Sequence, residues 1–318
     1  MEKVDVSILI STRNRASVLR QTLQSLRNQH LNGIRWEIVV VDNGSSDDTA
    51  QVLHEAQSWL PLIPLTEPTP GKNRALNRAL DVVTGELLIF TDDDTEHTEQ
   101  WVSELVAASK QWPEVSIFGG PVIPLLPPET PEWIRQNRRI TSIAFSHFDL
   151  NHTENTRLED PTLPFGPNYA LRAAAVDGKR FSLSLGPQAA DPQSPLGDET
   201  EFLARIYEEN QQIGYVPRAK VFHRVETHQL ESAWLFNRAF RFGRGFVHFA
   251  PNTTSVRLGG IPARLIVVFC LTWLFHHLFF FRAEPQKFKT SSTLHFLRGQ
   301  IFEYRRLHRS DQLNSYRA

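Results

Sequence analysis

Short apolar segments alternate with amphipathic segments along the first half of the chain. Residues 4–10 and 36–41 are almost continuously apolar, which is typical of strands buried on both faces of a sheet. Between them, residues 17–27 place their apolar side chains on one face of a helix. Strands that alternate with helices in this order predict an α/β fold with a doubly wound, mostly parallel sheet and right-handed crossovers.

The same alternation continues downstream and then changes character. It predicts helices over 49–59, 73–82 and 99–110, a short strand between Pro61 and Pro64, and strands over 87–90 and 115–118. Residues 121–131 are rich in proline, and we expect an irregular loop there that forms part of an acceptor pocket or a lid. The chain then returns to the sheet over 165–171, forms a helix from 197 to about 209, and adds short strands over 215–217 and 220–223.

Residues 265–281 contain no Asp, Glu, Lys or Arg. This segment is shorter than the roughly 20 residues that span a bilayer, and His276 and His277 near its end are costly in hydrocarbon. Because basic residues flank and follow it, we expect an interfacial or re-entrant contact with the inner face of the cell membrane. A true span and a buried helix or oligomer contact remain the alternatives. The expected division is a catalytic domain of residues 1–245 and a helical, membrane-associated region of residues 246–318.

Composition limits the kinds of partner and compartment. The chain has 318 residues, 41% of them hydrophobic and 22% charged, which is enough to bury a full core. Its formal net charge of -1 provides no field that would attract nucleic acid, so no nucleic-acid partner is expected. A single cysteine, Cys270, fits a reducing compartment. The sequence from Met1 lacks the apolar run of a signal peptide, and we expect the catalytic part in the cytoplasm.

Three consecutive carboxylates, Asp92, Asp93 and Asp94, directly follow the apolar strand 87–90 and Thr91. Ligands of open α/β sheets bind just outside the carboxyl ends of such strands. Crowded oxygen donors suit Mg²⁺ or Mn²⁺, which takes further ligands from the phosphates of a substrate. The motif therefore predicts a site for a metal ion and a diphosphate. The alternative is an acidic helix start ahead of residues 95–109.

Five motifs, in this order and spacing, give the chain a family resemblance over roughly residues 4–245. It resembles the inverting family 2 glycosyltransferases, which have the GT-A fold, a nucleotide-diphospho-sugar transferase type of sheet. The motifs are residues 6–15 (VSILISTRNR), 39–47 (VVVDNGSSD), 71–77 (GKNRALN), the Asp92 to Asp94 triplet, and 197–202 (GDETEF).

The resemblance implies where the nucleotide sugar binds. In that family the end of the first strand and the aspartate after the second strand hold the base and ribose, and Thr12 stands where the family usually has proline. Within the triplet, the resemblance implies that Asp92 meets the ribose, Asp94 binds the metal and Asp93 supports both. The alternative for Lys72 and Arg74 is a solvated helix face. The alternative for Asp42 is turn or N-cap chemistry. The implied nucleotide-sugar contacts are Thr12, Arg13, Arg15, Asp42, Lys72, Arg74, Asp92 and Asp93.

The acidic motif at 197–202 resembles the position of the family's general base. Matching by position gives that role to Glu199, and Asp198 remains open because the family more often has aspartate there. One carboxylate would take the proton of the acceptor hydroxyl while its oxygen attacks the anomeric carbon, and the metal would stabilise the departing diphosphate. Ordinary capping of a helix start is the alternative.

Further candidates lie outside the motifs. His223 resembles the histidine that completes metal or diphosphate binding in GT-A enzymes, with packing as the alternative. Arg241 and Arg244, spaced three apart after Arg238, would line one helix face and grip a diphosphate or an anionic lipid carrier; a solvated basic face is equally compatible. We expect Trp133 and Asn168 to line the acceptor pocket. For Trp133, packing in the core is an equally good interpretation of the sequence.

The function these features predict is metal-dependent, inverting glycosyl transfer from a nucleotide-diphosphate sugar, with a UDP-sugar favoured, to a hydroxyl acceptor. The apolar tail favours a lipid-linked glycan or a cell-surface polysaccharide precursor as acceptor. A sugar nucleotidyltransferase is the first alternative, although residues 11–17 lack the glycine-rich phosphate loop that it needs. A non-catalytic membrane-associated scaffold with the same fold is the second alternative.

Overall fold

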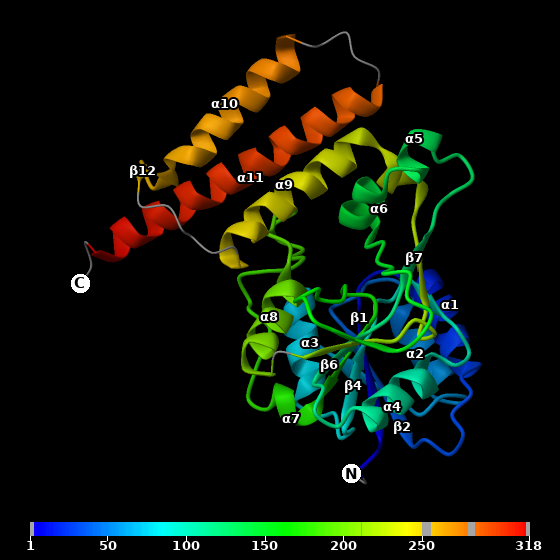
Figure 1. Ribbon diagram of the computed structural model, residues 1–318. Helices are drawn as coiled ribbons and strands as arrows, with labels where there is room; N and C mark the ends of the chain where they lie inside the picture. Colours follow the sequence, from blue (N-terminus) through cyan, green and yellow to red (C-terminus); the bar gives the residue numbers. More distant parts are fainter. Residues whose placement is uncertain (1–2, 211, 250–255, 279–283, 316–318) are drawn as a thin grey trace.

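The computed structural model describes residues 3–210, 212–249, 256–278 and 284–315, and this part of the chain is built around an eight-stranded sheet (Figure 1). In spatial order its strands are β3 (Leu62–Thr66), β2 (Trp36–Asp42), β1 (Val6–Thr12), β4 (Leu87–Phe90), β9 (Tyr169–Arg172), β6 (Ile117–Gly119), β10 (Ile213–Tyr215) and β8 (Thr156–Leu158). Strands β3, β2, β1 and β4 are parallel, whereas β9 runs antiparallel between β4 and β6. The predicted α/β fold with a mostly parallel sheet is confirmed.

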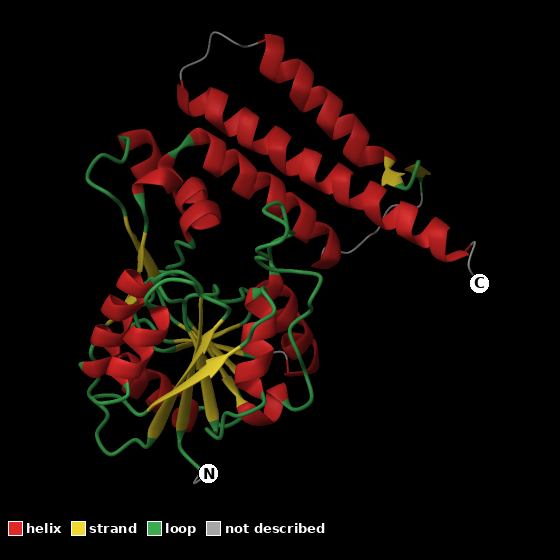
Figure 2. Cartoon of the chain, turned by 180° about the vertical axis from the view of Figure 1, so that it is seen from behind, coloured by secondary structure: helices red, strands yellow, loops and turns green. Residues whose placement is uncertain are grey.

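Helices cover both faces of this sheet, as Figure 2 shows from behind. One face carries α1 (Ala16–Arg27), α2 (Thr49–Ala56) and α4 (Trp101–Gln111), and the other carries α3 (Lys72–Leu80), α7 (Ala173–Val176) and α8 (Asp198–Asn210). Neighbouring residues of β1 belong to the hydrophobic clusters on opposite faces of the sheet. Ile8 and Ile10 pack with α1, whereas Leu9 packs with α3. Because successive side chains of a strand point to opposite faces, a strand between two helical layers is apolar at most positions. This explains the continuous apolar runs of the sequence.

A second, three-stranded sheet corrects two expectations. It consists of β5 (Thr95–His97), β11 (Val221–Arg224) and β7 (Val122–Leu125), in that order. Residues 95–97 are therefore a strand, and the alternative of an acidic helix start at the triplet is wrong. The proline-rich segment 121–131 is irregular only in part, because β7 lies within it. Pro124 is tolerated since β7 is an edge strand, where one missing backbone donor disrupts no interior ladder.

The rest of the chain is largely helical and lies at one end of the sheet (Figure 1). Its elements are α5 (Glu132–Arg135), α6 (Arg138–Phe145), the 3₁₀ turn η1 (Thr227–Leu230), α9 (Ser232–Phe249), the hairpin β12 (Arg257–Leu258) and β13 (Ile261–Pro262), α10 (Ala263–Leu278) and α11 (Glu284–Ser315). Helix α9 continues past residue 245 and packs along α11, so the expected division at 245 falls inside a helix. The division into two regions stays a prediction.

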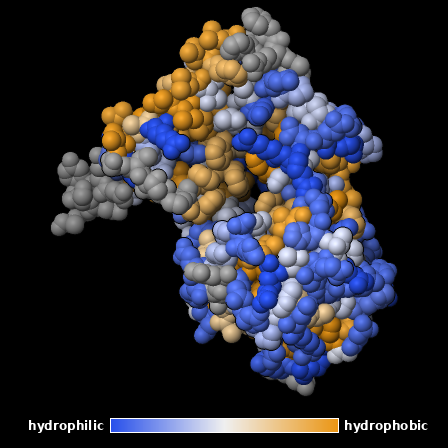
Figure 3. Space-filling model, viewed as in Figure 1, coloured by the Kyte–Doolittle hydropathy of each residue, from blue (hydrophilic) through white to orange (hydrophobic). Residues whose placement is uncertain are grey.

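Helix α10 contains most of the predicted apolar segment; residues 279–281 lie outside the described residues. Leu265 is buried against α11, whereas Val267, Leu271 and Leu278 are more than half exposed. Figure 3 shows hydrophobic surface gathered over this helix. No helix in the described part of the chain has both the length and the apolarity needed to cross a membrane.

Candidate active site

The acidic triplet leaves the sheet at the carboxyl end of β4 and opens into a cavity of about 570 Å³. The cavity is lined from several directions: the end of β1, the start of α3, the start of α8, His223 of β11, and α9. Asp93 and Asp94 are each only 5% exposed. Burying two adjacent carboxylates is costly unless cations or hydrogen-bond donors face them, and the surrounding residues supply both.

Arg15 is the main cation facing Asp93 and Asp94. Its guanidinium lies 3.3 Å from Oδ1 of Asp93 and 3.0 Å from Oδ2 of Asp94. The hydroxyl of Thr12 donates a hydrogen bond of 2.7 Å to Asp93. Burial nevertheless raises the pKa of Asp93 to about 7, because the neighbouring Asp94 adds to it and Arg15 and Thr12 only partly oppose it. A raised pKa of Asp93 beside a lowered pKa of Asp94 reduces the negative charge of the triplet near neutral pH.

His223 faces Asp94 from the small sheet. Its Nε2 lies 3.5 Å from Oδ2 of Asp94, and its Nδ1 bonds the backbone oxygen of Phe145 at 2.9 Å. Burial alone would raise the pKa of Asp94, but His223 and Arg15 outweigh it and hold the carboxyl well below its ordinary value. Oδ1 of Asp94 is buried without a hydrogen-bond partner. An ionised carboxylate oxygen without a donor, next to an imidazole, is the kind of donor set that a divalent cation accepts.

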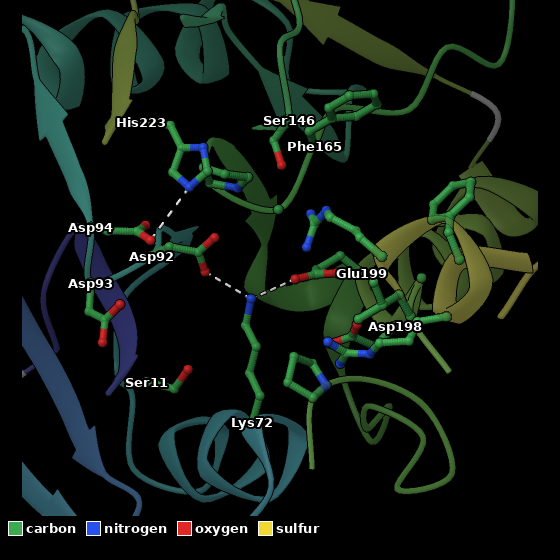
Figure 4. A pocket seen from close by; sticks show the side chains of 18 of the residues that line it. Ser11, Lys72, Asp92, Asp93, Asp94, Ser146, Phe165, Asp198, Glu199 and His223 are labelled. Atoms are coloured by element: carbon green, nitrogen blue, oxygen red, sulfur yellow. Dashed lines mark hydrogen bonds and ion pairs between the residues drawn. The ribbon is translucent and has the colours of Figure 1, made fainter. Parts of the chain in front are cut away.

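Lys72 connects the triplet with the acids of α8, as Figure 4 shows. Its Nζ lies 2.8 Å from Oδ1 of Asp92 and 2.6 Å from Oε1 of Glu199. Burial would raise the pKa of Glu199, but the Lys72 ammonium outweighs it and lowers that pKa to about 2. The same two carboxylates raise the pKa of Lys72 well above its ordinary value against the effect of burial. Glu199 is therefore ionised and Lys72 charged over the whole physiological range.

Asp198 differs from its neighbour Glu199. It is 1% exposed, and burial together with the charge of Glu199 raises its pKa well above the ordinary value. Two glycines make room for these acids: a Cβ at Gly166 would lie 2.7 Å from Oε1 of Glu199, and one at Gly186 would lie 2.7 Å from Oδ2 of Asp198. Gly186 also has a φ of +85°, which favours glycine. The environment of the acids at the start of α8 thus favours the protonated form of Asp198 and the ionised form of Glu199.

Most of the predicted site residues meet in this one cavity. Those that line it are Thr12, Arg13, Arg15, Lys72, Asp92, Asp93, Asp94, Asp198, Glu199, His223 and Arg241. Asp42 and Arg74 do not line it. Asp42 accepts a hydrogen bond from the backbone of Ser45 within its turn, and Arg74 is exposed on α3.

Three further candidates have structural contacts instead of a place on the cavity wall. Asn168 is fully buried; it accepts from the Trp101 indole and donates to two backbone oxygens. The ring of Trp133 packs against Phe288 of α11 at 4.9 Å between centroids. Arg244 is buried against Glu303, with its Nε 2.8 Å from that carboxylate. An acceptor or phosphate contact by these three has no support in this geometry.

The three arginines of α9 do not share one face as expected. Arg238 and Arg241 line the cavity, whereas Arg244 points to α11. Three residues advance a helix by about 300°, so each step rotates the side chain by about 60° relative to the previous one. Over two steps the third arginine leaves the cavity. The arginine pattern alone therefore could not show which of the three reach the site.

Sequence reasoning missed several lining residues. Asn43, beside the predicted Asp42, lines the cavity and accepts a 2.6 Å hydrogen bond from the backbone of Gly71. It lies inside the 39–47 motif, so that motif could have indicated it. The loop 187–196 also contributes lining residues, among them Gln188 and Pro192. Nothing in the pattern of that loop marks it as part of a site.

Comparison with known proteins gives one family and several relatives. The family described as Glycosyl transferase family 2 matches residues 7–169, just over half of the chain. The succinoglycan biosynthesis protein ExoM of Rhizobium meliloti is 26% identical over 249 residues, which cover 76% of this chain and 74% of that protein. A pre-mycofactocin glycosyltransferase of Mycobacterium tuberculosis is 27% identical over 251 residues, 75% of this chain but only 46% of that protein.

Solved structures share the fold. The mannosyltransferase PcManGT from Pyrobaculum calidifontis, solved with GDP-Man and Mn²⁺, superposes with a TM-score of 0.57 at 17% identity and covers 96% of this chain and 88% of that one. S. aureus TarS 1–349, solved with UDP-GlcNAc, gives a TM-score of 0.51 at 16% identity and covers 98% and 92%. At such identities the likeness concerns the fold.

Proposed function

The chain belongs to glycosyl transferase family 2 and is a glycosyltransferase, and from this premise we propose that it moves a sugar, with inversion, from a nucleotide-diphosphate sugar to a hydroxyl acceptor. The family assignment argues against the alternative that the chain is a sugar nucleotidyltransferase. The observation that carries the proposal is the pair of acidic groups, the triplet after β4 and the acids of α8, that face one cavity and are bridged by Lys72.

Glu199 is the proposed general base. It lines the cavity, and Lys72 lowers its pKa and favours its ionised form, whereas burial and the charge of Glu199 raise the pKa of the neighbouring Asp198 and make Asp198 the less suited base. In a single displacement, Glu199 takes the proton of the acceptor hydroxyl while the oxygen bonds to the anomeric carbon and the bond to the diphosphate breaks. A displacement with one base and no covalent sugar intermediate inverts the anomeric configuration.

Lys72 is proposed to change partners when the donor binds. While it pairs with Glu199, it holds that carboxylate at a pKa of about 2, which makes it a weak base. A donor diphosphate in the cavity competes for the ammonium, because phosphate oxygens are strong acceptors for charged donors. Release of Lys72 raises the pKa of Glu199, so that donor binding prepares the base for the acceptor.

Asp94 and His223 are the proposed protein ligands of Mn²⁺ or Mg²⁺. Among the described residues, no group of three or more His, Cys, Asp or Glu side chains is arranged to hold a metal by itself. Oδ1 of Asp94, which has no hydrogen-bond partner, and the adjacent imidazole of His223 suit a cation that takes its remaining ligands from a diphosphate. The cation would supply positive charge for the leaving diphosphate. The Mn²⁺ in the solved mannosyltransferase supports this reading.

The nucleotide is proposed to lie at the end of β1, against Thr12, Arg13 and Asn43, with a UDP-sugar as the favoured donor. Fold relatives were solved with both UDP-GlcNAc and GDP-Man. For the acceptor, a precursor of a cell-surface polysaccharide or a lipid-linked glycan is proposed. The name of the succinoglycan biosynthesis relative supports the first.

A peripheral contact of α10 with the inner face of the cell membrane is part of the proposal. Leu271, Trp273 and Leu274 are each about half exposed or more, and Arg264 is exposed at the start of the same helix. Apolar side chains next to basic ones are suited to the boundary of an anionic bilayer.

Calorimetric titration with UDP, GDP and their common sugar conjugates tests the donor site, first with Mn²⁺ and then with EDTA. We expect one nucleotide to bind in Mn²⁺ and binding to be lost in EDTA. If no nucleotide binds in either condition, the proposed function is wrong. If a sugar nucleotide binds but no free nucleotide diphosphate is released when a bacterial lipid extract is supplied as acceptor, the scaffold alternative gains support.

A further inference from the structure

A second cavity, of about 260 Å³, lies between α6, α9 and α11. These three helices lie side by side in Figures 1 and 2. Most of its lining is apolar, and the apolar lining residues include Ile140, Leu235, Phe246, Phe288 and Phe296. We call this cavity the apolar groove. An apolar concavity of this kind stabilises a ligand by removing hydrocarbon from water.

The apolar groove adjoins the candidate active site. Ile143 and Ala144 of α6 and Arg238 and Phe242 of α9 line both cavities. The cavity that contains Glu199 and the groove therefore adjoin each other between α6 and α9, on the two sides of these four residues. A molecule that presents a hydroxyl to Glu199 can extend its far end into the groove.

The charged residues of the groove are all basic. Arg139, Arg238 and Lys289 line it, and its lining includes no Asp or Glu. Arg238, at the junction, donates to the backbone oxygen of Ile143 at 3.2 Å and stacks on the ring of Trp234. No carboxylate of the described residues forms an ion pair with Arg238. A guanidinium held by a backbone oxygen and a ring, with donors left over, is suited to bind a phosphate.

We propose that the apolar groove binds the hydrocarbon chain of a lipid phosphate or diphosphate that carries the acceptor sugar. The phosphate lies at Arg238, between the two cavities, with Arg139 and Lys289 adding positive charge. The chain then fills the groove, and the sugar hydroxyl lies in the active-site cavity at Glu199. This inference rests on the proposed function, because it assigns a class of acceptor to the same site.

Binding of dodecyl phosphate, used below its micelle-forming concentration, tests this proposal by calorimetry. Dodecanol and inorganic phosphate serve as comparison ligands that each lack one half of the probe. We expect dodecyl phosphate to bind at least about tenfold more tightly than inorganic phosphate, since burial of even a few methylene groups contributes that much.

Two matched pairs of variants locate the binding. Ser292 lines the groove whereas the adjacent Ser291 does not, so S292F should weaken dodecyl phosphate binding by about tenfold or more and S291F should leave it unchanged. Lys289 lines the groove whereas Arg298, also exposed on α11, does not. K289E should therefore weaken binding and R298E should not. Thermal unfolding of S292F shows whether this variant folds. If it does not, K289E and R298E still test the proposal, because both substitutions are at exposed positions.

Donor titration of the same proteins separates the two proposals. All four variants should bind the sugar nucleotide as the wild type does, because none of these residues lines the active-site cavity. If the wild type binds the nucleotide but not dodecyl phosphate, or if S292F and K289E bind the lipid phosphate like their controls, the lipid groove is wrong and the proposed function stands. If the wild type binds no nucleotide, the proposed function fails instead. Equal affinity for two-chain phosphatidylglycerol would assign the groove to membrane lipid and overturn the acceptor assignment.

Discussion

Lys72 lies between two carboxylates that come from distant parts of the chain, Asp92 after β4 and Glu199 at the start of α8. This one ammonium determines the charge of the base, because it lowers the pKa of Glu199 against the effect of burial. The sequence showed this lysine and the two acidic motifs but not that the lysine joins them. At the scale of single residues, the structure therefore adds what the sequence could not show, which is how Lys72 affects the protonation of Glu199.

The variant K72M should move the acid limb of the kcat/KM profile to higher pH. Without the ammonium, burial raises the pKa of Glu199 from about 2, so the carboxylate is protonated, and inactive as a base, at a higher pH than in the wild type. The pH dependence of kcat/KM measures this shift. R78M, which removes an exposed cation of the same helix, is the control and should leave the profile unchanged. An unaltered acid limb in K72M would contradict the coupling.

The variant E199Q should lower the transfer rate by about 10²- to 10⁴-fold, the usual contribution of a general base. Its donor affinity should change much less, since Glu199 meets the acceptor. Turnover and donor titration measure the two effects. E201Q is the matched control, because Glu201 lies in the same helical turn but pairs with Arg205 at 2.7 Å. Normal turnover of E199Q would move the role of the base to Asp198.

At the scale of the elements, α9 and α11 approach each other unusually closely through glycines. A Cβ at Gly243 would lie 2.0 Å from the backbone oxygen of Phe296, and one at Gly299 would lie 2.0 Å from that of Phe240. Backbone atoms cannot yield as a flexible side chain can. The glycines thus allow α11 to lie directly on the helix that carries Arg238 and Arg241.

The variant G299A should lower the free energy of unfolding by about 1 to 3 kcal/mol, the usual cost of overpacking. The added methyl group forces the two helices apart at Phe240, so thermal and urea unfolding should both show the loss. S310A, at an exposed position of the same helix, is the control and should have little effect. Unchanged stability of G299A would mean that the helices do not approach as closely as described.

Glu303 of α11 is fully buried and joins three elements. It pairs with Arg244 and His248 of α9 and with Arg306 of its own helix, while Arg244 also pairs with Asp191 at 3.3 Å. Asp191 belongs to the loop that contributes Gln188 and Pro192 to the active-site cavity. The C-terminal helix is therefore connected to the wall of the site through an ion network centred on the buried Glu303 and Arg244.

Stability should fall at acid pH through Glu303. Its basic partners outweigh the effect of burial and lower its pKa to about 2, below the ordinary value near 4.3. The network therefore stabilises the fold fully above about pH 4.3 and loses this contribution as the pH falls toward about 2. Urea unfolding measures the free energy of unfolding at pH 6 and at pH 3. E303Q should be less stable than the wild type at pH 6 by about 3 kcal/mol. The difference between the two pH values should be smaller in E303Q than in the wild type. Equal pH dependence in both would exclude the network as its source.

At the scale of the whole molecule, the exposed apolar side chains gather on α10, away from the sheet (Figure 3). The other described helices of this region bury most of their apolar side chains in two clusters, although Ile143, Phe246 and Phe302 are partly exposed. The prediction of a membrane-facing helix thus gains an exposed surface that fits it, and the contact itself stays a prediction.

The variant L271E should weaken association with vesicles that contain anionic phosphatidylglycerol. Leu271 is 61% exposed, so the substitution adds a charge to the apolar surface without disturbing a core. Co-flotation with vesicles measures the effect, and donor titration should be unchanged. L258E, an equally exposed leucine in the hairpin β12 and β13, is the control for added charge. Equal flotation of the two variants would contradict a specific contact by α10.

The sequence by itself determined the sheet, the family and the acidic motifs, because these depend on local features. Strands buried on both faces are apolar at most positions, as in β1 and β4, and motifs such as the Asp92 to Asp94 triplet are contiguous in the chain. Its errors lie where pairing is non-local: β5 and β7 become strands only because β11, about a hundred residues later, lies between them.

Only the tertiary structure decided how distant residues share the site. The pairing of Lys72 with Glu199, the divergence of Arg244 from Arg241, and the burial of Asn168 depend on packing between elements that no local pattern encodes. The same holds for the apolar groove, whose lining comes from three helices. Because burial and neighbouring charge set the pKa of a side chain, the protonation states of Asp198 and Glu199 also follow from the packed structure alone.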